Sequence, residues 1–222
     1  YFLFSFLEKY IYKNSNQIFS NLKFFNLRLN ELNIQKKFFY LPDLINFKKI
    51  NNDKGKLNLI YCGTENKSNN FNIIYDFIKK ISKNLNNISI YIFLYNSKNN
   101  KYKSNGNIKI QQNKSVKYIE KFIIKKKINY GLSSINYSEL YRYGTSPRKF
   151  NLYKKFSISN VNLCLKKNKK HDFWKYSYNF NYLNFNSEFK SLVKFFNSKK
   201  IKKKYSSYYN LVIEKKLNKF VK

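Results

Sequence analysis

Histidine and cysteine are scarce in this chain of 222 residues, and their scarcity limits the kinds of site that the chain can build. It holds one histidine, His171, and two cysteines, Cys62 and Cys164, at no spacing typical of a zinc site or a disulfide framework. We therefore expect no metal, and packed thiols in a reducing compartment. No apolar run reaches transmembrane length, and the apolar opening 1–7 is too short to span a bilayer.

Glycine is also rare, with 5 residues, and the glycine-rich motifs that bind nucleotide phosphates are missing. The absence of G-x-G-x-x-G argues against a dinucleotide site of that type. The absence of G-x-x-x-x-G-K-[ST] excludes a nucleotide-hydrolysing P-loop.

Acidic residues are few, so the charge is strongly one-sided: 45 Lys and Arg against 11 Asp and Glu give a net charge of +34. Such a charge favours phosphate-bearing ligands, nucleic acid or anionic lipid headgroups. Codon bias offers a second explanation, because Lys, Asn, Ile, Phe and Tyr, which dominate the chain, all have AT-rich codons. The 43% hydrophobic and 20% aromatic content excludes a disordered basic tail.

Strand and helix periodicities alternate through the middle of the chain, which predicts an α/β fold, a Rossmann-like doubly wound parallel sheet with right-handed crossovers. We expect strands at 57–62, 88–94, 107–110, 128–132 and 156–161, and helices at 71–85, 116–123 and 147–155. Helices are also expected at 6–14, 21–33, 188–197 and 199–219, and short extended segments at 17–20 and 38–42.

Two places should lie at the carboxyl ends of the strands, where open parallel sheets bind ligands. The first is Gly63–Thr64, where glycine lets the backbone approach a phosphate. The second is the start of the helix at Pro147, with Ser146 as N-cap. Arg148 and Lys149 follow in its first turn, where cations oppose the helix dipole unless an anion is bound. An ordinary turn and an ordinary capped helix are the alternatives.

The residues 128–132 followed by 143–153 resemble the segment of group 1 glycosyltransferases that reads roughly "d-i-G-l-a-P-l … K-S-P-x-K-x-x-E-Y". Upstream, Phe39–Ile45 resembles the family's "v-i-P-N-g-v-D" crossover between domains, and 7–20 is similar to the end of its acceptor domain. Downstream, 187–221 resembles its two closing helices.

The resemblance implies a GT-B fold and divides the chain into four parts. Residues 1–45 would be the tail of the acceptor domain and the crossover, and 46–56 a linker. Residues 57–185 would be the nucleotide-sugar-binding domain, and 186–222 the closing helices. It implies a metal-independent glycosyltransferase of hexosyltransferase type. The enzyme would transfer a sugar from a nucleotide-sugar to a glycan or lipid-linked acceptor in polysaccharide biosynthesis, with no cofactor. It implies a cytoplasmic protein, peripheral at the inner face of an anionic membrane.

The resemblance also assigns residues. Lys149, with Arg148, would face the pyrophosphate, Gly63 would lie near the donor phosphates, and Lys67 would supply a further basic group. Residues 130–135 would approach the base.

Two positions depart from the motif. Its ribose-binding glutamate falls on Leu152, which cannot accept a hydrogen bond, and the partner eight residues earlier falls on Gly144. Glu139 is the nearest carboxylate that could substitute. The chain also lacks the acceptor domain, where a catalytic base would sit, so a catalytically inactive glycosyltransferase-like domain is an alternative. A basic nucleic-acid-binding, ribosome-associated protein is another, since 21 tyrosines could stack on bases.

Overall fold

The computed structural model divides the chain into two compact units, which are treated separately below. The first contains the described residues up to 40, and the second contains those from 48 onward. The structure describes residues 2–20, 25–40, 48, 56–65, 70–96, 102–134, 148–163 and 177–198.

The second unit is built on a sheet of six strands, in which every neighbouring pair is parallel. Its spatial order is β5-β4-β3-β6-β7-β8, which is the strand order of a Rossmann fold when the strands are counted along the chain. The predicted Rossmann-like parallel sheet is therefore confirmed. The strands are β3 (Leu57–Gly63), β4 (Ile88–Leu94), β5 (Ile108–Gln112), β6 (Tyr130–Ser133), β7 (Ser159–Leu163) and β8 (Ser177–Phe180).

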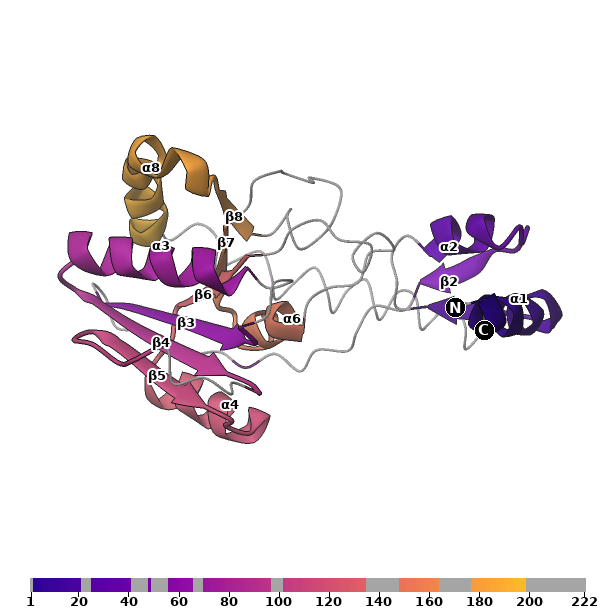
Figure 1. The fold of residues 1–222 in the computed structure, drawn as a ribbon, viewed down its shortest axis with the longest axis horizontal. Coiled ribbons are helices and arrows are strands. Elements are labelled where there is room, and N and C mark those ends of the chain that lie inside the picture. The colour runs from indigo at the N-terminus through magenta and orange to yellow at the C-terminus, as the bar shows by residue number, and fades with distance from the viewer. Residues whose placement is uncertain are drawn as a thin grey trace. The chain divides into compact units, whose positions relative to one another are not determined.

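Helices cover both faces of this sheet (Figure 1). On one face lie α3 (Phe71–Asn84) and α8 (Phe185–Asn197), and on the other α4 (Val116–Lys125) and α6 (Arg148–Lys155). Both faces of β3 and β4 are therefore buried, which explains their continuous apolar sequences. Each fully buried aliphatic or aromatic side chain stabilises the fold by about 1.5–3 kcal/mol.

Two strands differ from expectation. The segment 156–161 was expected to be a strand, but Phe156, Ser157 and Ile158 form the turn that follows α6, and β7 begins at Ser159. Ser157 has a φ of 53°, and the Ile158 N–H donates to the Tyr153 carbonyl at 2.9 Å. Strand β8 was not anticipated. It is followed by the 3₁₀ turn η2 (Tyr182–Asn184), and α8 begins three residues earlier than the periodicity predicts.

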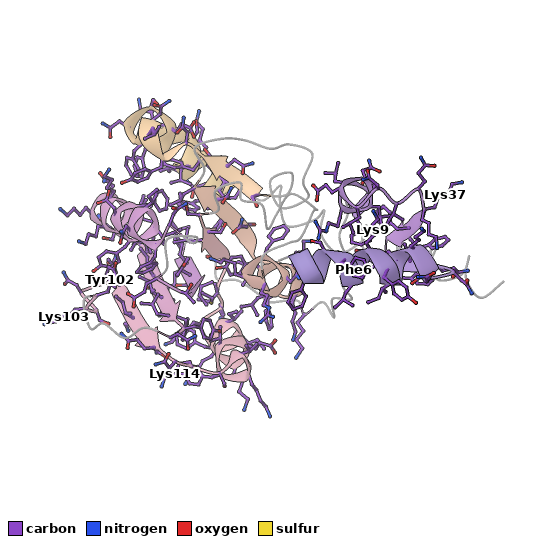
Figure 2. The ribbon with its side chains drawn as sticks, turned by 45° about the vertical axis from the view of Figure 1, so that its right-hand side comes forward. Phe6, Lys9, Lys37, Tyr102, Lys103 and Lys114 are labelled. Atoms are coloured by element: carbon purple, nitrogen blue, oxygen red, sulfur yellow. The ribbon has the colours of Figure 1, made fainter. Side chains whose placement is uncertain are left out.

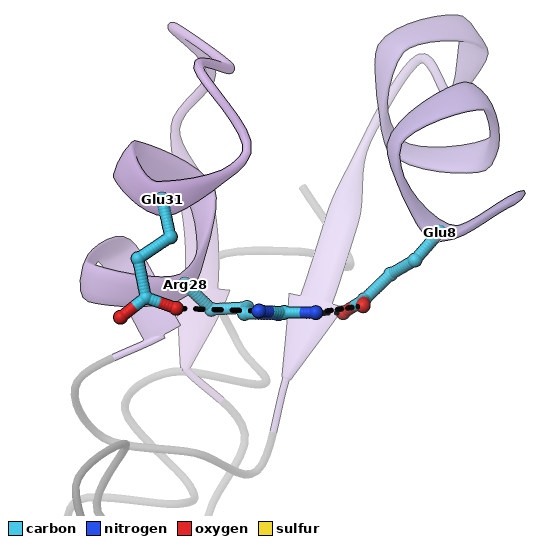
Figure 3. A network of polar contacts seen from close by, with 3 residues as sticks. All are labelled: Glu8, Arg28 and Glu31. Carbon is cyan, nitrogen blue, oxygen red and sulfur yellow. Dashed lines mark hydrogen bonds and ion pairs between the residues drawn. The ribbon is translucent and has the colours of Figure 1, made fainter. Parts of the chain in front are cut away.

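The first unit contains α1 (Phe2–Asn14), β1 (Ile18–Ser20), α2 (Phe25–Glu31) and β2 (Phe38–Tyr40). Its two strands are parallel, and its core is formed by five buried residues, Ile18, Phe25, Leu29, Leu32 and Ile34. An ion-pair network joins its helices (Figure 3): Arg28 on α2 lies 2.6 Å from Glu8 on α1 and 3.2 Å from Glu31.

Within the part of the chain that the structure describes, none of the helices combines the length and apolarity needed to cross a bilayer.

Three helices end in a residue with a left-handed backbone: Asn33, Lys127 and Ser157. After each of them, the N–H of the next residue donates a hydrogen bond to a backbone carbonyl in the last turn of the helix. For α4, this bond joins the Ile128 N–H to the Ile123 carbonyl at 3.1 Å. Glycine usually takes this position, because a Cβ costs roughly 1 kcal/mol there. Lys127 is the least suited of the three, because the left-handed region favours short polar side chains such as Asn over a long lysine side chain.

We predict that Lys127→Gly stabilises the protein by roughly 0.5–1 kcal/mol, because it removes the left-handed strain at φ 48°. Urea unfolding measures the change. Lys126→Gly is the matched control: Lys126 has a φ of −92°, so glycine there relieves nothing and should destabilise slightly. Equal effects of the two substitutions would contradict the prediction.

Candidate functional site

The candidate site lies where the order of the strands reverses. Strands β3 and β6 are adjacent and parallel, with Leu59 opposite Tyr130. From β3 the chain proceeds to β4 on one side, and from β6 to β7 on the other. Ligands of open α/β sheets bind outside the carboxyl ends of the strands at such a switch point. The residues at those two ends are Gly63–Thr64 and Ser133–Ser134.

Helix α6 is held unusually close to the sheet at this point. A Cβ on Gly131 of β6 would lie 2.4 Å from the ring of Tyr153, so only glycine allows the contact. The buried Tyr153 hydroxyl lies 3.0 Å from the Leu132 carbonyl oxygen and 3.2 Å from that of Ile60, and its single proton is shared between these two acceptors. One side chain thus ties α6 to both strands of the switch point and fixes where the first turn of α6 lies.

That first turn places Lys149 over the end of β3. Its Nζ lies 3.1 Å from the position that a Cβ on Gly63 would take, and 4.7 Å from the centroid of the Tyr61 ring. The Tyr61 hydroxyl donates to the Thr64 carbonyl at 3.1 Å. The fold therefore brings Gly63, Thr64 and Lys149 together, although 85 residues separate the last two in the sequence (149 − 64).

The ammonium of Lys149 is poorly solvated. Burial lowers its pKa from 10.5 to about 8, and the neighbouring Cys62 opposes this shift. Burial raises the pKa of the Cys62 thiol to about 12, so the thiol stays protonated at neutral pH. Burial likewise raises the pKa of Tyr61. Cys62 and Tyr61 beside Lys149 are therefore uncharged at pH 7, and Lys149 brings a positive charge to this point of the sheet edge.

A buried polar network lies beside the switch point, on the face of the sheet that carries α6. The Ser133 hydroxyl donates to Asn160 Oδ1 at 3.1 Å, and Asn160 Nδ2 donates to Ser177 Oγ at 2.7 Å. Asn162 Nδ2 donates to Asn179 Oδ1 at 3.3 Å. Polar groups in a parallel sheet are stable when they satisfy one another, as here. The network fixes Ser133 at the end of β6.

Other predicted site residues have different outcomes. Arg148 is exposed in the first turn of α6. Leu152 is half-buried and packs against the core between the sheet and helices α4 and α6. Four of the residues assigned earlier, Lys67, Glu139, Gly144 and Ser146, lie outside the described residues.

Sequence reasoning missed Tyr61 and the asparagines of β7. Tyr61 lies within the apolar run of its strand, which is the pattern of an ordinary core position. Asn160 and Asn162 fall at the end of a strand whose expected bounds were shifted. Their spacing of two was the signal that could have placed them on one face of a strand. Among the residues that the structure describes, no group of three or more His, Cys, Asp or Glu could hold a metal.

The fold is similar to that of a solved glycosyltransferase, TarM, with a TM-score of 0.51 and 17% sequence identity. The match covers 95% of this chain and 45% of the TarM chain, so this chain spans less than half the length of that protein. The chain therefore has a glycosyltransferase-like fold. No family model and no curated protein matches it in sequence.

We predict that Gly131→Ala destabilises the protein by roughly 1–3 kcal/mol, because the new methyl group overlaps the Tyr153 ring. In a Tyr153→Leu background the same change should cost less, since the ring is gone. Urea unfolding of the two single variants and the double variant measures this coupling. If the costs of the two single substitutions simply add up in the double variant, the contact with Tyr153 is not the reason that position 131 requires glycine.

A second prediction concerns Lys149 and pH. Below pH 8 the Lys149 ammonium is protonated in both the folded and the unfolded chain. The burial of this charge then lowers the free energy of unfolding by its full amount. From pH 8 towards 10.5 the folded chain releases this proton while the unfolded chain keeps it. The contribution of Lys149 to the free energy of unfolding therefore rises with pH, by roughly 2 kcal/mol up to pH 9.5.

The test compares Lys149→Met with the unchanged chain by urea unfolding between pH 7 and 9.5. The substitution should remove this rise, and Lys79→Met on the exposed face of α3 should not. The range stops below pH 10, where buried tyrosines with raised pKa values, such as Tyr61 and Tyr130, begin to lower stability. An unchanged pH profile in Lys149→Met would refute the assignment.

Proposed function

We propose that the second unit binds the diphosphate of a nucleotide-sugar at the β3–β6 switch point and is the donor-binding half of a glycosyltransferase. One observation carries the proposal: the desolvated Lys149 ammonium lies against Gly63 at the carboxyl end of β3. The similarity of the fold to that of TarM supports the same function.

The chemistry of the site suits a diphosphate. A phosphate oxygen that approaches Lys149 would compensate the ammonium that burial has left poorly solvated. Gly63 has no side chain to obstruct that approach, since a Cβ there would already contact the Tyr61 hydroxyl and Lys149. During transfer, the same cation would stabilise the charge that develops on the departing nucleoside diphosphate. This electrostatic role would make the transfer independent of a metal and of a cofactor.

Five further residues belong to the proposal. Arg148, exposed in the same turn, would contact the outer phosphate oxygens. Ser146, Lys67 and Thr64 would complete the phosphate site. Glu139 would replace the ribose-binding carboxylate that Leu152 lacks.

The sugar would be passed to a glycan or lipid-linked acceptor, of the kind used in polysaccharide biosynthesis. The acceptor site and the catalytic base would come from an acceptor-binding half, because residues 1–45 resemble only the tail of that half. We therefore expect the 222-residue chain to bind donor without turning it over.

We predict that Lys149→Met weakens binding of UDP or GDP at pH 7 by about 10–100-fold, the usual effect of losing a charge-assisted hydrogen bond. Isothermal titration calorimetry measures it. Because bound phosphate favours the protonated ammonium, binding at pH 8 to 9 should also take up a proton, seen as a dependence on buffer ionisation enthalpy. Lys149→Met should abolish this uptake.

Lys79→Met has the same change of net charge on the exposed face of α3, and should leave affinity unchanged within about twofold once long-range charge is screened by salt. Nucleotide binding that both variants weaken equally would refute a local site. Strongly salt-sensitive RNA binding without nucleotide binding would favour the nucleic-acid function instead.

A further inference from the structure

Tyr61 is a buried tyrosine that contacts two parts of the candidate site. It lies in β3, two residues before Gly63, and it is fully buried (0% exposed). Burial raises the pKa of its hydroxyl, so the hydroxyl stays protonated at neutral pH. The hydroxyl donates to the Thr64 carbonyl at 3.1 Å, which ties the core of the second unit to the backbone that follows β3.

The ring of Tyr61 is itself held in place by other aromatic rings. It packs against Phe71 in the first turn of α3, with 5.2 Å between centroids. Phe71 in turn contacts the ring of Tyr102 edge-on at 4.9 Å (Figure 2 labels Tyr102). The Tyr102 hydroxyl donates to Asn72 Oδ1 at 2.9 Å, which joins this ring to α3 as well. Packing on this scale restricts the Tyr61 ring to one position, so the ring can serve as a fixed support.

The ring of Tyr61 supports the ammonium of Lys149. The Lys149 Nζ lies 4.7 Å from the ring centroid, within the range of a cation–π contact. A lysine side chain is long and flexible, and holding it in one place costs conformational entropy. The ring face favours a position beside Gly63, where a Cβ would lie 2.6 Å from the Tyr61 hydroxyl oxygen and 3.1 Å from Nζ. One side chain therefore lies against both the cation and the glycine of the proposed phosphate site.

Resting on the function proposed above, we propose that Tyr61 is a positioning residue of the donor site. Its ring holds the Lys149 ammonium over the end of β3, and its hydroxyl holds the backbone at Thr64. A cation that is in place before the ligand arrives costs less to order when the ligand binds. Because the ring acts through Lys149, replacing the ring should weaken phosphate binding only in a chain that still has Lys149.

The first test needs no ligand and follows the titration of Lys149 in the full chain by NMR, through the carbon resonance of its Cε. Loss of this resonance in Lys149→Met identifies it. The unchanged chain should titrate with a pKa of about 8. Tyr61→Leu should lower this pKa by about 0.5–1 pH unit, because leucine offers no negative ring face to the ammonium. Tyr61→Phe keeps the ring and should leave the pKa of Lys149 within about 0.2 of that value.

The matched control is Tyr91→Leu, which removes a buried tyrosine ring from β4. That ring contacts Phe122 on α4, with 4.9 Å between centroids, and its loss should not change the pKa of Lys149. Fluorinated phenylalanines at position 61 test the same contact in a chain whose core stays filled. The pKa of Lys149 should fall as fluorine atoms are added, because they withdraw charge from the ring face. A pKa that rises or stays constant in Tyr61→Leu and in the fluorinated series would overturn the proposal.

The second test measures UDP affinity at pH 7 by isothermal titration calorimetry for Tyr61→Phe and Tyr61→Leu, each with and without Lys149→Met. Tyr61→Phe loses only the hydrogen bond to Thr64 and should weaken binding about twofold to fivefold. Tyr61→Leu should weaken it about threefold to tenfold further. In the Lys149→Met background the phenylalanine and leucine variants should bind UDP equally. A difference of the same size in both backgrounds would show that the ring acts on the fold and not through Lys149.

The two tests separate this role of Tyr61 from the function of the site. No binding of UDP or GDP by the unchanged chain would refute the proposed function, whatever the titration shows. UDP binding that Tyr61→Leu leaves unchanged would keep the donor site and refute the positioning role of Tyr61.

Discussion

The contact between Gly131 and Tyr153 is the constraint on which the candidate site depends. It lets α6 approach β6 more closely than any side chain at position 131 would permit. The Tyr153 hydroxyl then bonds the carbonyls of Leu132 and Ile60, on the two strands that diverge at the switch point. Because Lys149 lies one turn before Tyr153 on the same helix, this anchor determines that its ammonium reaches the end of β3.

The position of Lys149 lowers the stability of the fold in two ways. A lysine in the first turn of a helix opposes the positive end of the helix dipole, and burial of its ammonium adds a second penalty. The Tyr61 ring offsets part of this by a cation–π contact at 4.7 Å. An apolar residue would avoid both penalties, and in the proposed function the phosphate of the donor is the anion that offsets them.

The sequence predicted most of the second unit because its periodicities are local. The continuous apolar run of β4 and the proline before α6 each gave one element nearly to the residue. Strand β8 was missed because Ser177 and Asn179 have the polarity of a loop, and only pairing with β7 makes the segment a strand. Gly63 and Lys149 were each identified as candidates from local chemistry, but their contact depends on strand order, and no local pattern identified Tyr61 as their neighbour.

In the proposed donor site, leucine at position 152, where the resembling motif has its ribose-binding glutamate, shifts the expected balance of binding. Leu152 packs against the core behind α6, so its position supplies no acceptor for the ribose hydroxyls. A nucleotide would then be held chiefly through its phosphates, by the half-buried Lys149 and by the attraction of a chain with net charge +34. Long-range attraction is screened by salt, whereas a contact with desolvated Lys149 is screened far less. Discrimination between nucleotides would therefore rest on the base, near the ends of β6 and β7, where Ser133 is fixed by Asn160.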